Sequence, residues 1–175
     1  MKKILFLLSA LILFSCDDGD LEVEELDFNP DSVENCDDDT SVLFIINGDE
    51  AIILTLDAGL LINETTVLDE PREGTITAND FDVNIRIFSG TVSNTYFCSA
   101  VPLTEPSVIS ELNALSGTIE VTTTQNETNP LQFDHEIRFK SVVFENDGNG
   151  ERLIDSDYLF GNFSTTAPET TTTKN

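Results

Sequence analysis

Positive charge is scarce in this chain, and so are the residues that usually build metal sites. Its 175 residues include 8 lysines and arginines against 33 aspartates and glutamates, which gives a formal net charge of −25. Because proteins bind a phosphate backbone mainly through lysine and arginine, this composition excludes nucleic acid as a partner. One histidine and three scattered cysteines are too few for a zinc ribbon or a histidine-rich zinc site. We therefore expect no metal and no cofactor.

Residues 1–15 have the pattern of an export signal. Met1-Lys2-Lys3 is a basic start, and Ile4 to Phe14 is an almost wholly apolar run. The run is too short to cross a bilayer as a helix, which takes roughly 20 residues, so a signal peptide is expected. The end of the run, Leu13-Phe14-Ser15-Cys16, resembles the lipobox of bacterial lipoproteins. That resemblance implies cleavage after Ser15 and acylation of Cys16, whereas the alternative is an ordinary signal peptide with a cysteine placed by chance.

An acidic tract, Asp17-Asp18-Gly19-Asp20, directly follows this cysteine. Together with the lipobox, the tract resembles the start of small envelope lipoproteins of Bacteroidota, of the flavobacterial type. The resemblance implies a lipid-anchored protein of the outer membrane, exposed at the cell surface. In enterobacteria, Asp17 would instead imply retention at the inner membrane, and a third reading is a self-repelling spacer.

The composition divides the rest of the chain into three parts. Residues 16–40 carry many acids, no base and few apolar side chains, so we expect an acidic flexible tether that cannot offset its ordering entropy. Residues 164–175 are polar and rich in threonine, which predicts a disordered tail. Residues 41–163 are left as a single folded domain with ample length for one core.

The apolar residues of 41–163 follow a period of two, which indicates β-strands. Alternation is clear in 82–87, 119–123 and 133–139, and a phase shift after Lys140 predicts a bulge near Ser141. The continuous apolar runs 42–46 and 52–56 predict central strands covered on both faces, joined by a tight hairpin at Asn47-Gly48-Asp49-Glu50. A last strand is expected over 158–163.

Short strands separated by turn signals predict an all-β fold, an antiparallel β-sandwich of Ig-like or jelly-roll-like type. At most one short helix is expected. Its predicted position is 106–116, where Val108, Ile109, Leu112 and Leu115 have helical spacing and Gly117 can end the turn.

Cys36 and Cys98 form an even pair once Cys16 is acylated, so an exported chain is expected to join them in a disulfide. The bridge would close a loop of 98 − 36 = 62 residues. The alternative is a catalytic thiol, which needs a base, and His135 is the one histidine available. Because His135 shares a strand face with Phe133 and Phe139, we expect a hydrogen-bonded core residue and assign no catalytic residue.

Oxygen ligands gather near one turn, at Asp147, Asn149 and Glu151, and calcium binds ligands of this type. The segment fails the EF-hand register, so a solvated hairpin turn is expected there and no metal site is assigned. Separately, Asp31-Ser32-Val33 resembles the short O-glycosylation site of exported Bacteroidota proteins, which implies Ser32 as an acceptor.

These observations predict a membrane-anchored, surface-exposed lipoprotein that serves as a non-catalytic binding or accessory module of the cell envelope. Its expected partners are the membrane, through the lipid anchor, and envelope proteins or glycans. The strong negative field favours cationic ligands. One alternative is a hydrolase that uses two carboxylates on an extracellular polymer, which a pocket carboxyl group of raised pKa would indicate. The other is a purely structural component, which an exposed apolar patch or an open strand edge would indicate.

Overall fold

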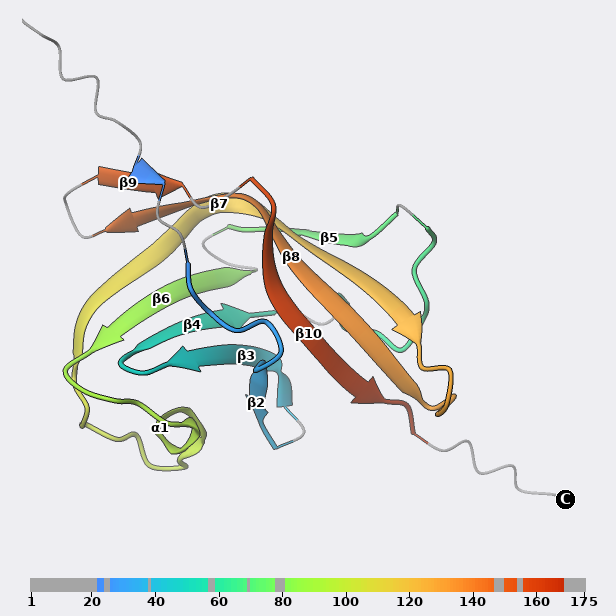
Figure 1. The fold of residues 1–175 in the computed structure, drawn as a ribbon, viewed down its shortest axis with the longest axis horizontal. Helices are drawn as coiled ribbons and strands as arrows, with labels where there is room; N and C mark the ends of the chain where they lie inside the picture. Colours follow the sequence, from blue (N-terminus) through green and yellow to red (C-terminus); the bar gives the residue numbers. More distant parts are fainter. Residues whose placement is uncertain are drawn as a thin grey trace, which may run out of the picture.

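The computed structural model describes residues 22–23, 26–37, 39–56, 59–68, 70–77, 81–146, 150–153 and 156–168. The elements in chain order are β1 (Glu22–Val23), β2 (Glu34–Cys36), β3 (Asp39–Asn47), β4 (Glu50–Thr55), β5 (Arg72–Thr75), β6 (Asp82–Phe88), α1 (Asn94–Cys98), β7 (Val108–Gln125), β8 (Gln132–Asn146), β9 (Gly150–Leu153) and β10 (Tyr158–Thr166). The strands form a nearly closed, barrel-like sandwich with one short helix, which confirms the predicted all-β class (Figure 1).

Two long strands, β7 and β8, belong to both layers of the sandwich. The sheet order is β1-β9-β8-β7-β6-β4-β3-β2, while β10 pairs with β8 and β5 pairs with β7. The first half of β7 pairs with β6 and its second half with β5, whereas β8 pairs first with β10 and then with β9. In Figure 1, β7 and β8 therefore arch over β6, β4 and β3, and β10 runs alongside β8.

The main core fills the space between the two layers. Its inward side chains from β3, β4 and β6 are Leu43, Ile45, Ile52, Leu54, Val83 and Ile85. The opposing side chains from β7, β8 and β10 are Ile119, Val121, Ile137, Phe139 and Phe160. Every one of these residues is buried, as the period of two in the sequence predicts. The hairpin between β3 and β4 is also confirmed, because Asn47 pairs with Glu50 and Gly48 has a φ of 66°.

A bulge bends the two long strands from one layer into the other. Ser116 pairs with Val143 and Thr118 with Lys140, so Ser141 and Val142 oppose the single residue Gly117. Ser141 has a φ of 50° and Gly117 a φ of 137°, which marks both as the corner of their strands. The structure thus confirms the bulge predicted near Ser141.

The helix expected over 106–116 is wrong, because these residues begin strand β7. Leu112 is buried, whereas Val108, Ile109 and Leu115 are exposed, so the helical spacing does not create a buried face. Pairing with β6 on one side and β8 on the other decides the conformation instead. The short helix forms over Asn94–Cys98.

The folded part extends beyond the expected limits of 41 and 163 at both ends. Phe28 is packed in the main core and β2 pairs with β3, so the fold begins within the expected tether of 16–40. Strand β10 continues to Thr166, inside the expected tail of 164–175. The reason at the first end is a close backbone approach, in which Asn162 N donates to Pro30 O at 3.1 Å. A few apolar residues, Leu26, Phe28 and Val33, are enough to dock this acidic segment.

We expect Gly117→Ala to lower the free energy of unfolding by about 3 kcal/mol, because the site combines a positive φ with backbone contact. A Cβ there would lie 2.7 Å from Val142 Cα. Denaturant unfolding measures the change. Gly48→Ala is the matched control, since Gly48 has a positive φ but nothing within 4 Å of an added Cβ. It should cost about 1 kcal/mol. Equal losses for the two variants would contradict a close-packed corner at Gly117.

Candidate functional site

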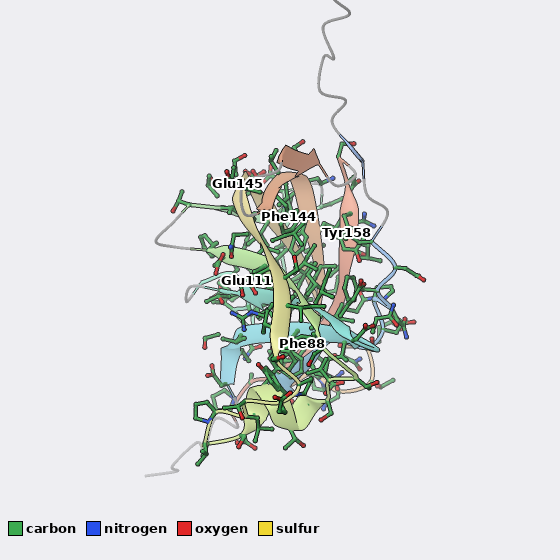
Figure 2. The ribbon with its side chains drawn as sticks, turned by 90° about the vertical axis from the view of Figure 1, so that its left-hand side faces the viewer. Phe88, Glu111, Phe144, Glu145 and Tyr158 are labelled. Carbon is green, nitrogen blue, oxygen red and sulfur yellow. A yellow bond between two sulfur atoms is a disulfide. The ribbon has the colours of Figure 1, made fainter. Side chains whose placement is uncertain are left out.

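Strands β3 and β4 are buried on both faces, as their continuous apolar runs predict. Their outward side chains Phe44, Ala51 and Ile53 form a second apolar cluster with Phe88 and Val92. Aromatic side chains of α1 cover part of this cluster. The rings of Phe97 and Phe44 stack at 4.5 Å between centroids, and Tyr96 meets Phe88 edge-on at 5.0 Å. Figure 2 shows Phe88 next to α1, with Glu111 farther from the helix.

A disulfide between Cys36 and Cys98 holds this cover in place, and it confirms the predicted pairing. The two Cα atoms lie 5.2 Å apart, and the bond joins the edge strand β2 to the end of α1. The helix has five residues and no side-chain cap at its start, so it cannot be stable by itself. The bridge and the aromatic packing therefore position α1. Because both sulfurs are used in the bridge, neither cysteine acts as a free thiol in this structure.

Beside the cover lies a groove of about 390 Å³, a size that suits a small ligand or a side chain. Its lining residues are Cys36, Asp39, Val42, Phe44, Ile53, Thr55, Asp82, Asn84, Arg86 and Phe97. The floor is the outward face of β3, β4 and β6. Phe97 and Cys36 form the covered side, and the acids Asp39 and Asp82 are at the rim.

Sheet register brings the polar groups of β6 into this groove. Thr55 pairs with Asp82 and Ile53 pairs with Asn84, so each polar residue of β6 lies beside an outward residue of β4. The alternation in 82–87 correctly predicted the strand, but its polar face looked like an ordinary solvated surface. The sequence gives no signal that α1, which lies farther along the chain, would pack beside the polar face of β6.

Asn84 is the most unusual group in the groove. Its side chain is buried with 6% exposure, and Nδ2 donates a hydrogen bond to Asp82 Oδ2 at 3.0 Å. Because a carboxylate only accepts, this bond fixes the amide orientation and leaves Oδ1 as the free end. Oδ1 has no hydrogen-bond partner among the described residues. A buried acceptor without a partner costs about 1–3 kcal/mol, so the fold keeps this oxygen at the expense of stability.

The charged groups of the groove leave it anionic. Arg86 is paired with Glu111 on β7 through its Nε, so its positive charge is neutralised at the groove edge. Asp39 accepts two hydrogen bonds on Oδ1, from the hydroxyl and the backbone N–H of Ser41. The Ser41 hydroxyl is the larger cause, and together the two bonds lower the pKa of Asp39. The groove therefore offers ionised acceptors and no carboxyl group shown to hold a proton.

His135 lies in a separate, buried hydrogen-bond chain and not in the groove. Its Nδ1 lies 2.8 Å from Thr123 Oγ1, and its Nε2 lies 2.7 Å from Thr165 Oγ1. Arg72 donates to Thr123 Oγ1, so that hydroxyl is free to donate to Nδ1, and Thr165 in turn donates to Asn63 Oδ1. A neutral imidazole with the proton on Nε2 satisfies every partner. The prediction of a hydrogen-bonded core histidine is confirmed.

The remaining sequence candidates stay apart from the groove. Ser32 sits in a turn where its hydroxyl donates to Asn29 O at 2.7 Å, and its glycosylation stays a prediction. Cys16, Asp147 and Asn149 lie outside the described residues, and Glu151 is placed only by its backbone in β9. Within the described ranges, no group of three or more His, Cys, Asp or Glu side chains could hold a metal ion. No helix in this part of the chain is long and apolar enough to span a bilayer.

We expect Asn84→Leu to raise the free energy of unfolding by about 1 kcal/mol, because it removes a buried acceptor that lacks a partner and keeps the same branched shape of the side chain. Its neighbours Ile53 and Phe44 can pack against the new side chain. Thermal and denaturant unfolding provide the measurement. A loss of 1 kcal/mol or more would mean that the amide stabilises the apo fold and is not held for a ligand.

We also predict that His135 makes stability depend on pH. Burial, aided by the charge of Arg72 and opposed by Asp134, lowers its pKa from 6.5 to about 4. The unfolded chain therefore binds a proton that the folded chain excludes, and stability is complete above pH 6.5 and falls as the pH drops toward 4. Between pH 7 and pH 5 we expect a loss of about 2 kcal/mol from this group.

The measurement is the unfolding free energy of wild type and His135→Gln at both pH values. Every other titrating group is common to the two proteins, so the difference between them isolates His135. The advantage of wild type should shrink by about 2 kcal/mol at the lower pH. A difference that stays constant would contradict the exclusion of a proton from this site.

No protein-family model matches the chain, and neither a curated protein nor a solved structure matches it. The candidate function therefore rests on the residues themselves and on the geometry of the groove.

Proposed function

We propose that the chain is a lipid-anchored protein of the bacterial cell envelope whose β-sandwich serves as a non-catalytic binding module. The lipobox and acidic tract at Leu13–Asp20 support the anchor, the outer-membrane location and the exposure at the cell surface. The observation that carries the binding role is the groove beside α1, together with its lining residue Asn84, whose buried Oδ1 has no partner among the described residues. A fold keeps a destabilising polar group most readily where a ligand satisfies it.

The direction of the pKa shifts supports binding over hydrolysis. A general acid acting on a polymer needs a carboxyl group whose pKa is raised, as a paired acid in a dry pocket has. In the groove, the hydrogen bonds from Ser41 lower the pKa of Asp39. The pKa values of Asp134 and Asp157, both outside the groove, are also lowered by hydrogen bonds. A lowered pKa stabilises the ionised form of Asp39, which suits a hydrogen-bond acceptor and not a general acid.

A structural role is the second candidate, and one feature favours it. From the loop after α1 into the start of β7, the chain exposes Val101, Leu103, Val108 and Ile109, with Val101 at 72% and Ile109 at 65% exposure. Such a stretch can pack against a partner protein without any use of the groove. The binding role therefore predicts that an envelope partner contacts the groove, whereas the structural role predicts that it contacts the exposed apolar stretch.

We expect metabolic labelling with a palmitate analogue to mark the wild-type protein and to leave Cys16→Ala unmarked, because the thiol is the acylation site. Affinity purification after cross-linking of whole cells then tests the groove. Thr55→Phe fills the groove and should lose the partner that wild type captures, while Ile109→Asp should keep it. Loss with Ile109→Asp alone would assign the partner to the exposed apolar stretch. Equal labelling of both proteins would end the proposal of a lipid anchor.

A further inference from the structure

We propose that the groove binds a primary ammonium group on an aliphatic stem, and that its natural ligand is a lysine side chain of a partner protein. This inference deepens the proposed function and depends on it. It rests on the kind of polar atoms that the groove leaves free, on its apolar floor and on the charge around it.

Two carboxylates that line the groove each have an oxygen without a partner among the described residues. Asp82 receives the Asn84 bond on Oδ2, which leaves its Oδ1 for a ligand. Asp39 takes both Ser41 bonds on Oδ1, which leaves its second oxygen for another donor. A ligand that fits must therefore donate hydrogen bonds, and an ammonium group has three donors and no acceptor.

The groove is apolar where the stem of such a ligand would lie. Val42, Phe44 and Ile53 form its floor, and the ring of Phe97 forms one wall. Lysine buries its methylene groups along surfaces of this kind while its charged head reaches polar atoms.

The surrounding charge attracts a cation and repels an anion. Each of the four basic side chains that the structure describes is engaged. Arg86, Arg138 and Lys140 pair with carboxylates, and Arg72 donates to Thr123 and to backbone carbonyls. The chain as a whole carries a formal charge of −25, so its field concentrates cations at the surface. Lysine fits better than arginine, because acceptors that are spread around the groove suit a compact ammonium and not a planar fork.

The test is calorimetric binding of a short peptide with one lysine, acetylated and amidated at its ends, to the full-length protein in detergent. Saturable binding that weakens with salt is expected, because the contact joins opposite charges. The same peptide with Nε-acetyl-lysine or norleucine should bind at least about tenfold more weakly, since each lacks the charged donor. Equal binding of the acetylated peptide would overturn the proposal.

Protein variants locate the site. Asp82→Asn and Asn84→Leu should each weaken binding by about tenfold, because the first removes a charged acceptor and the second removes the amide that holds this acceptor in place. Asp49→Asn is the matched control, since it removes one negative charge from the exposed hairpin loop outside the groove lining. It should change binding by less than about twofold, as screening predicts for a distant surface charge. Equal effects of Asp82→Asn and Asp49→Asn would mean that the peptide is attracted only by the overall negative charge, and would overturn the groove as its binding site.

The same variants separate this inference from the proposed function. If a neutral oligosaccharide binds and Asn84→Leu abolishes that binding, the groove is a binding site but the ammonium assignment is wrong. If the lysine peptide fails to bind while Thr55→Phe still loses the envelope partner, the proposed binding function is supported and the ammonium ligand is rejected. Should Asn84→Leu fail to fold, Asp82→Asn carries the test, because its side chain is exposed.

Discussion

The outward face of β3 and β4 imposes the constraint on which the site depends. Phe44 and Ile53 point away from the main core, yet they are as apolar as the residues inside it, so the sheet needs a cover on this side. The cover is a five-residue helix that the Cys36–Cys98 bridge holds to the neighbouring edge strand. Because this cover is short, it ends before the polar residues of β6. The groove lies where the part of the sheet face that α1 covers meets the part that it leaves uncovered.

The groove and the hydrogen-bond chain around His135 differ in whether their buried polar groups have hydrogen-bond partners. Around His135 each donor meets an acceptor, and the chain from Arg72 to Asn63 joins a loop to the four strands β5, β7, β8 and β10. In the groove, by contrast, Asn84 keeps one oxygen unpaired although the side chain is almost fully buried. Tyr158 OH, beside the main core, is also buried without a partner among the described residues, so Asn84 stands out because it lines the groove and not through its unpaired atom alone.

Sequence periodicity was sufficient for the strands but not for the site. The alternation in 133–139, the two apolar runs and the phase shift at Ser141 each have a local physical cause, so these features could be predicted. The helix over 106–116 was wrong because the local spacing of Val108, Leu112 and Leu115 is helical, whereas pairing with β6 and β8 makes the segment a strand. The groove could not be predicted, since it depends on which distant segment covers the face that holds Asn84. The disulfide was predictable from cysteine number alone.

The pairing of β1 with β9 limits the reach of an anchored protein. With acylation at Cys16, as proposed above, 22 − 16 = 6 residues separate the lipid from the first residue of β1. A fully extended segment of that length covers at most about 20 Å, whereas a tether that ran to residue 41 would cover about 85 Å. The folded domain would then stay close to the lipid headgroups. Other proteins anchored in the same membrane would be its most accessible partners.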